Sequence, residues 1–236
     1  MFCHNCGTNV EANAGICPVC GQSLKTSERP FMPTPPPLPP LPFVPPPNPS
    51  VQTSKWISEG WAIVQNDLPM FALMAFIVSA VGSAVPIVLQ GAMAVGFHIA
   101  ILRKMRTGKL DIGDCFKGFD FLVPSMVAAF LIAVFVTLGT LACLIPGLVL
   151  YAMYQFTYLF ILDKRLDFWP AMQASSNLVL KEPMGFTLFA LALFGLNVAG
   201  ALMCVVGLFI TMPITVAAVT VAYRDLVGFE PQTATL

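Results

Sequence analysis

Three long stretches without a formal charge most constrain how this sequence can fold. They are residues 68–102, 121–162 and 183–223, with lengths of 35, 42 and 41 residues. About 20 apolar residues in a helix cross the hydrocarbon core of a bilayer, so each of the two longer stretches fits two spans joined by a short turn. The stretches therefore predict a polytopic membrane protein.

The overall composition supports the same class of protein. Only 10% of the 236 residues are charged, against about a quarter in ordinary soluble domains, and 57% are apolar. Twelve basic and twelve acidic residues leave no net charge, so the chain lacks the basic excess that favours nucleic acid. We expect neither a soluble globular enzyme nor a nucleic-acid-binding protein.

We expect an all-α polytopic membrane bundle with six transmembrane helices, near residues 68–84, 86–103, 121–141, 146–162, 184–203 and 205–223. Membrane orientation follows the lysine and arginine content of short loops. With six spans, the three turns on one side carry no basic residue, and ten basic residues lie on the other side: Lys55, Arg103, Lys104, Arg106, Lys109, Lys117, Lys164, Arg165, Lys181 and Arg224. The sequence thus predicts an inner-membrane protein with both termini in the cytoplasm.

The six spans are also interpreted as three repeated helical hairpins. A segment with aromatic and polar residues precedes each hairpin, and each hairpin begins near a proline: Pro69, Pro124 or Pro183. Proline suits the first helical turn because its missing N–H would have no partner there. The second helices align at a spacing of 60 residues and lead to Lys104, Lys164 and Arg224. We expect three copies of an interfacial helix followed by a hairpin, with Trp56, Trp61 and Trp169 at the membrane surface.

The N-terminus carries four cysteines in the pattern C-x2-C-x10-C-x2-C, with a glycine after each pair. Two cysteines at this spacing can present both sulfurs to one ion, and glycine accepts the positive φ of the tight turn that follows. The pattern predicts a structural Zn²⁺ bound by Cys3, Cys6, Cys17 and Cys20, with no open position for a substrate water. His4 could replace a ligand or be an exposed loop residue. Iron would suit the same thiolates, and two disulfides or a redox C-x-x-C are competing interpretations.

Residues 2–24 resemble the short zinc ribbons at the N-terminus of many bacterial and archaeal proteins, with the form CxxCG, about ten residues, CPxCG. The resemblance implies a small β-rich binding or structural module and no particular activity. Because so small a module has almost no apolar core, we expect metal binding to supply most of its folding free energy.

Composition divides the chain into four regions: a zinc ribbon at 1–25, a proline-rich linker at 26–52, the six-helix membrane domain at 53–228 and a disordered tail at 229–236. Proline occupies 12 of the 20 positions from 30 to 49. Proline fixes φ and removes the amide donor, so a polyproline II arm is expected. The arm is interpreted as a stiff spacer, and its P-x-x-P spacings could also dock into an aromatic groove.

The membrane part contains a second recognisable pattern. Leu144-Ile145-Pro146-Gly147 opens a helix, Asp163 follows, a connecting segment contains alanine and serine at 171–176, and the last helix closes on Tyr223. This pattern, over roughly residues 55–228, resembles a group of bacterial six-helix membrane proteins that includes the membrane domain of some glycerophosphodiester phosphodiesterases. The resemblance implies architecture. The chain has no room for the catalytic barrel, so the phosphodiesterase activity is not expected.

The predicted spans contain no Asp, Glu, Lys or Arg, the groups that ion-coupled transporters and intramembrane enzymes place inside the bilayer. The remaining polar residues are interpreted mainly as packing or interhelical hydrogen-bonding groups: Gln90, His98, Gln155 and Asn197. The acidic residues next to the spans, Asp163, Asp167 and Glu182, are interpreted as solvated loop residues.

We therefore expect a non-enzymatic binding or scaffolding component. Its partners would be the lipid bilayer and a protein that recognises the zinc ribbon or the proline-rich arm. The alternative is a small-molecule transporter or lipid-handling protein with a cavity lined by Gln90, Gln155 and Asn197. Beyond Zn²⁺ no cofactor is indicated, and the sequence does not predict the oligomeric state.

Overall fold

The computed structural model describes residues 2–3, 5–11, 16–21, 43–47, 49–84, 88–203, 207–231 and 233. The chain divides into two compact units, Met1–Leu41 and Pro42–Leu236. His4, most of the proline-rich linker and part of the predicted tail lie outside the described residues.

The first unit contains little regular structure in its described part. Phe2 and Asn9 form an isolated antiparallel bridge, and the amide of Cys3 donates to the carbonyl of Thr8 over 2.9 Å. Its buried apolar residues are Cys3, Val10 and Cys17. So few buried side chains supply little hydrophobic stabilisation, which is the physical reason to expect a metal to stabilise this unit.

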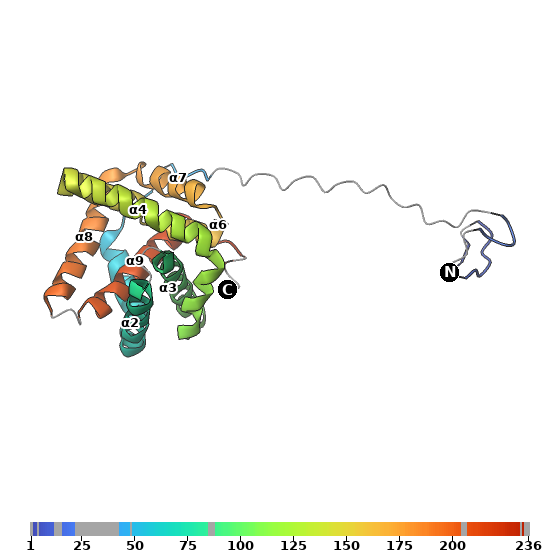
Figure 1. Cartoon of the computed structure of the whole chain (residues 1–236), viewed down its shortest axis with the longest axis horizontal. Coiled ribbons are helices and arrows are strands. Elements are labelled where there is room, and N and C mark those ends of the chain that lie inside the picture. The colour runs from blue at the N-terminus through green and yellow to red at the C-terminus, as the bar shows by residue number, and fades with distance from the viewer. Residues whose placement is uncertain are drawn as a thin grey trace. The chain divides into compact units, whose positions relative to one another are not determined.

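The second unit is helical (Figure 1). Its elements are α1 (Thr53–Val64), η1 (Gln65–Asp67), α2 (Leu68–Ala84), α3 (Val88–Thr107), η2 (Ile112–Phe121), α4 (Leu122–Ala142), α5 (Leu144–Tyr154), α6 (Thr157–Lys164), α7 (Phe168–Val179), α8 (Pro183–Leu202) and α9 (Leu208–Leu226). Five helical segments of the described chain are long and apolar enough to cross a membrane: Thr53–Ser83, Ile112–Ala142, Ile145–Lys164, Pro183–Leu202 and Leu208–Leu226. These helices indicate a membrane protein. α3, the remaining predicted span, is not among the five.

The predicted continuous span at 146–162 is broken in the structure between α5 and α6. The hydroxyl of Ser175, on α7, donates to the carbonyl of Met153 over 2.6 Å and accepts from the amide of Phe156 over 3.3 Å. A side chain inserted into the backbone ladder is a recognised cause of a helix kink. The break leaves Gln155 and Phe156 between the two helices.

α9 lies at the centre of the helical unit, between α8 and α3 (Figure 1), and it contacts α1 and α2 as well. Most of its residues from Thr211 to Tyr223 are buried. Trp56 of α1 is also buried, and its ring meets that of Phe189 edge to face at 5.1 Å. Trp56 is therefore buried inside the helical unit. The position of the three tryptophans at the membrane surface stays a prediction.

The three short elements α1, η2 and α7 share one packing pattern. Each precedes a pair of long helices in the chain, as the repeat hypothesis expects. η2 packs against α3, α7 packs against α6, and α1 packs against α9. Each short element thus contacts the last helix of a hairpin, and the α1–α9 contact closes the series into a ring. The internal repeat itself stays a prediction.

The basic residues that align at a spacing of 60 all form ion pairs at the ends of α3, α6 and α9. Lys104 pairs with Asp67. Lys164 Nζ lies 2.8 Å from Glu230 Oε1, and the Arg224 guanidinium lies 2.7 Å from Glu59 Oε2. Equivalent helix ends are therefore tied to acidic groups in other parts of the helical unit.

Candidate functional site

The four cysteines lie on two tight turns of the first unit. After the first pair, Gly7 has a φ of 71° and its amide donates to the carbonyl of Cys3 over 2.8 Å. After the second pair, Gly21 has a φ of 70° and donates to the carbonyl of Cys17 over 2.9 Å. Left-handed backbone is accessible to glycine at little cost, so the predicted role of both glycines is confirmed.

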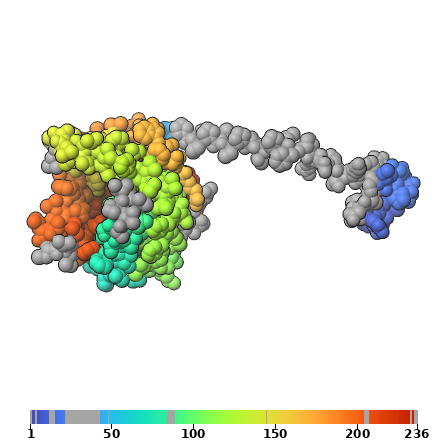
Figure 2. Space-filling view, in the orientation of Figure 1, coloured from blue at the N-terminus to red at the C-terminus, as the bar shows by residue number. Residues whose placement is uncertain are grey.

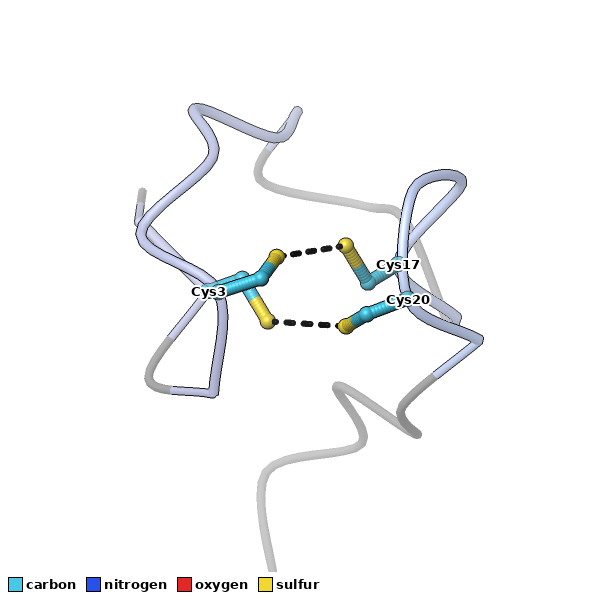
Figure 3. Close-up of side chains that lie close together, drawn as sticks. Cys3, Cys17 and Cys20 are labelled. Atoms are coloured by element: carbon cyan, nitrogen blue, oxygen red, sulfur yellow. Dashed lines mark hydrogen bonds between the residues drawn. The ribbon is translucent and has the colours of Figure 1, made fainter.

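The sulfurs of the two pairs face one another across a small space (Figure 3). Cys3 Sγ lies 3.6 Å from Cys20 Sγ, Cys6 Sγ lies 3.6 Å from Cys17 Sγ, and all four sulfurs lie within 4.8 Å of one another. A tetrahedral zinc site with Zn–S bonds of about 2.3 Å places its sulfurs roughly 3.8 Å apart. The donor set and its spacing therefore fit one Zn²⁺ ion.

The local hydrogen bonds favour the ligand form of one cysteine. Cys6 Sγ lies 3.3 Å from the hydroxyl of Thr8, and this hydrogen bond is the main cause that lowers the pKa of the Cys6 thiol to about 6. The thiolate is the form that binds metal, so a lowered pKa reduces the competition from protons near neutral pH. Sequence reasoning did not identify Thr8, although its position two residues after Cys6 is visible in the sequence.

Asp163 is not a solvated loop residue as the sequence analysis expected. Its side chain is buried, and its carboxylate accepts from the Tyr223 hydroxyl over 3.0 Å and from the Glu230 amide over 2.9 Å. Lys164 Nζ lies 3.5 Å from the same carboxylate. A buried carboxylate needs such partners to offset the loss of hydration. The signal in the sequence was the pairing of Asp163 with a closing Tyr223 in the pattern of the membrane part.

Asp114 of η2 is a second buried carboxylate, and sequence reasoning missed it. Both of its oxygens lie 2.9 Å from Arg103 Nη1 at the end of α3, and Lys117 Nζ lies 2.9 Å from one of them. This arrangement ties η2 to α3. Asp163 and Asp114 thus both have hydrogen-bond or ion-pair partners within the helical unit.

The other acidic residues expected in loops also have local roles. Asp167 caps α7 by accepting from the amide of Phe168 over 2.8 Å. Glu182 accepts from the amide of Val51 over 3.3 Å. Asp167 therefore stabilises the start of α7, and Glu182 links the start of α8 to the segment before α1.

Gln90, Gln155 and Asn197 do not line one cavity together, although the alternative prediction expected it. Gln90 is exposed on α3. Asn197 donates to the hydroxyl of Thr215 over 2.8 Å and accepts from that of Thr211 over 3.0 Å, so it bonds α8 to α9 as predicted. Gln155 is buried at the break between α5 and α6. The predicted trio is thus split between the surface, an interhelical contact and the interior.

Comparison with known proteins supports the interpretation of the N-terminal residues as a zinc ribbon. Residues 2–24 match the family of zinc-ribbon domains. The match contains all four cysteines that the structure brings together. A zinc ribbon with a four-cysteine cluster is thus present at the N-terminus, and its donor set indicates zinc binding.

Three uncharacterized mycobacterial proteins are similar to the chain. One is from Mycobacterium bovis and two are from strains of Mycobacterium tuberculosis, and each is 31% identical over 144 residues. The match covers 58% of this chain and 43% of each relative, so the chain spans less than half the length of these relatives. No solved structure gives a significant match.

Proposed function

We propose that this protein is an inner-membrane protein in which a six-helix domain anchors a cytoplasmic zinc ribbon, and that it acts as a non-enzymatic binding or scaffolding component. The four sulfurs within 4.8 Å of one another carry the proposal. Four protein ligands close the coordination sphere of Zn²⁺, so such a site stabilises a folded surface and offers no position for a substrate. A partner protein would then recognise the ribbon or the proline-rich arm.

The proposal treats α3 as the sixth span. Residues 88–102 of this helix contain no charged residue, and the basic residues follow in its last turns. α2 and α3 are in contact, as the two arms of a hairpin would be. With six spans the ten basic residues share the cytoplasmic side, which supports cytoplasmic termini. The resemblance to the membrane domain of some glycerophosphodiester phosphodiesterases stays a prediction about architecture.

The topology is tested by single-cysteine labelling in intact cells and in inverted membranes, mapped by peptide mass spectrometry. Cysteines at Ser83 and Leu202, together with native Cys143, should react with an impermeant reagent from the periplasm. A cysteine at Thr107 should react only in inverted membranes. Native Cys115 is buried and is therefore unsuitable as the cytoplasmic probe. Labelling of Thr107→Cys in intact cells would contradict the orientation.

The binding role is tested by in-membrane crosslinking of the full chain, comparing wild type with a Cys17→Ser, Cys20→Ser double variant. The variant should lose bound zinc, measured by elemental analysis, and should lose specific crosslinked partners while its membrane insertion is unchanged. A Cys143→Ser variant serves as a control because Cys143 lies in the helical unit. An unchanged partner profile after zinc loss would refute a ribbon-dependent scaffold.

A further inference from the structure

The helical unit contains a cavity of about 170 Å³ whose walls come from α3, α4, α5, α6 and α9. Its polar walls are His98, Tyr151, Tyr154, Gln155, Tyr158 and Thr215. None of the described residues that line it is charged. The volume corresponds to about six waters at the density of the liquid, so the cavity has room for a small polar group.

Gln155 lines this cavity and has a buried amide group without a hydrogen-bond partner among the described residues. Its side chain is 8% exposed, and neither its amide nitrogen nor its amide oxygen has a hydrogen-bond partner within the described part of the chain. Leaving both halves of a buried amide unpaired costs free energy, which a bound ligand can recover. The amide offers one donor group and one acceptor group to such a ligand.

His98 restricts which ligand fits. The hydroxyl of Thr220 donates its single proton to the carbonyl of Val216 over 2.7 Å. His98 Nδ1 must therefore be the donor in its 2.8 Å hydrogen bond with the Thr220 hydroxyl. In a neutral ring this leaves Nε2 as an acceptor, so a hydrogen bond from a ligand to this nitrogen needs a ligand that donates a proton. A carbonyl group alone would not satisfy it.

An apolar groove adjoins the cavity at Tyr151, which lines both. The groove has a volume of about 340 Å³ and lies between α4, α5 and α8, and its walls include Leu148, Leu191 and Phe194. Leu191 and Phe194 are about half exposed, so the groove opens at the surface of the helices. α4 and α8, yellow-green and orange, both lie at the outside of the helical unit in Figure 2. In the six-span arrangement proposed above, an apolar surface of this kind would face lipid chains.

We propose that the cavity and groove bind an uncharged lipid with a free hydroxyl group. The hydroxyl would donate to His98 Nε2 and exchange hydrogen bonds with the Gln155 amide, while the hydrocarbon chain would lie along α5 and α8. A lipid with an ionised head is excluded because no charged side chain among the described lining residues would compensate it. Diacylglycerols and long-chain isoprenoid alcohols share this chemistry. The site goes beyond the scaffolding role and does not depend on the zinc ribbon.

The test uses the full chain reconstituted in phosphatidylcholine vesicles that contain a diacylglycerol with a photoactivatable group in one acyl chain. After illumination, mass spectrometry should locate the label on α5 and α8. Unlabelled diacylglycerol or a long-chain isoprenoid alcohol should compete, and the stronger competitor identifies the source of the ligand. Triacylglycerol, which lacks a free hydroxyl, should not compete.

Gln155→Leu should reduce the labelling roughly tenfold, the effect expected when one hydrogen bond to the ligand is lost. Gln90→Leu makes the same chemical change at an exposed position of α3 and should leave the labelling unchanged. Each variant is compared only if its size-exclusion profile and thermal unfolding match wild type, and Gln155→Met replaces the leucine variant if they do not. Equal labelling after the Gln155 change, equal competition by triacylglycerol, or no label on α5 and α8 would each overturn the proposal.

Discussion

Two aspartates, Asp163 and Asp114, carry carboxylates inside the helical unit, and each has its own set of compensating partners. Asp163 accepts hydrogen bonds from the Tyr223 hydroxyl and from a backbone amide after α9. Asp114 instead forms ion pairs with Arg103 and Lys117. Removing one partner of a buried charge leaves that charge unsatisfied, which costs more than the interaction itself contributes. Both positions should therefore be sensitive to small chemical changes.

Tyr223→Phe removes only the hydroxyl that donates to Asp163. We expect the free energy of unfolding in detergent to fall by about 1.5–3 kcal/mol, the range for a hydrogen bond to a charged group. Combining this change with Asp163→Asn should give less than the sum of the two single losses, because both act on one interaction. Additive losses would show that the two side chains stabilise the protein independently.

Thr8→Val removes the hydroxyl whose hydrogen bond lowers the pKa of Cys6. The pKa of this thiol should then rise, so protons compete with zinc at higher pH. On acidification of the full chain, zinc release should begin at a higher pH in the variant than in wild type, as measured with a zinc-sensitive dye. Thr107→Val, in the helical unit, should leave the release curve unchanged, and coincident curves for all three proteins would contradict the role of Thr8.

At the scale of elements, glycines set the distance between α3 and η2. A Cβ added at Gly96 would overlap the carbonyl of Cys115, and one added at Gly118 would overlap the carbonyl of Ala92. The small residues Ala92 and Gly96 therefore lie where the backbones of α3 and η2 approach closely. Gly195 of α8 differs, because an added Cβ there would meet no atom within 4 Å.

Gly96→Ala should lower the free energy of unfolding by about 1–3 kcal/mol, because the backbone of η2 must move to make room. Gly195→Ala is the matched control, since it adds the same methyl group to a helix without a clash and should not lower stability. Thermal unfolding of both variants in detergent measures the difference. Equal behaviour of the two would mean that the α3–η2 contact adapts freely.

The positions of the helices could be predicted from the sequence, but the break between α5 and α6 could not. Apolar length determines how many residues cross a bilayer, so the predicted ends mostly agree with the helix ends within a few residues. The break depends on the hydroxyl of Ser175, which approaches from another helix. Hydropathy is continuous through Gln155, so no local signal marks the interruption.

The cysteine cluster could be predicted from the sequence, whereas the cavity in the helical unit could not. Cysteine spacing within a short segment predicted which four side chains meet, because two local turns place them. The cavity has walls from five helices, so only the fold brings His98 and Gln155 together. Burial of Trp56 likewise follows from its contact with α8 and α9, which its amphipathic character alone does not indicate.

At the scale of the whole molecule, the contact between α1 and α9 closes the ring of short elements and long helices. Asp225, near the end of α9, accepts from Lys55 Nζ over 2.8 Å and from Trp56 Nε1 over 3.2 Å. Arg224 adds a pair with Glu59. The first and last helices of the unit are therefore joined by side chains of both.

Asp225→Asn should lower the free energy of unfolding by about 1 kcal/mol, because the pair with Lys55 loses its charge at a partly exposed site. Glu59→Gln removes one acidic partner of Arg224, whose side chain is more exposed than that of Asp225. It should lower the free energy of unfolding by less than about half as much. Denaturation of both variants in detergent gives the comparison. A larger loss of stability for Glu59→Gln would mean that the pair of Arg224 with Glu59, and not Asp225, contributes most to the contact between α1 and α9.

This closure also has a consequence for biosynthesis. The ribosome delivers α1 first and α9 last, so α1 must wait for almost the whole domain to be translated before Trp56 and Lys55 meet Asp225. A chain without α9 would leave Trp56 Nε1 without its acceptor and would leave Lys55 with only Glu59 of its own helix. The junction between α1 and α9 thus distinguishes a complete helical unit from an incomplete one.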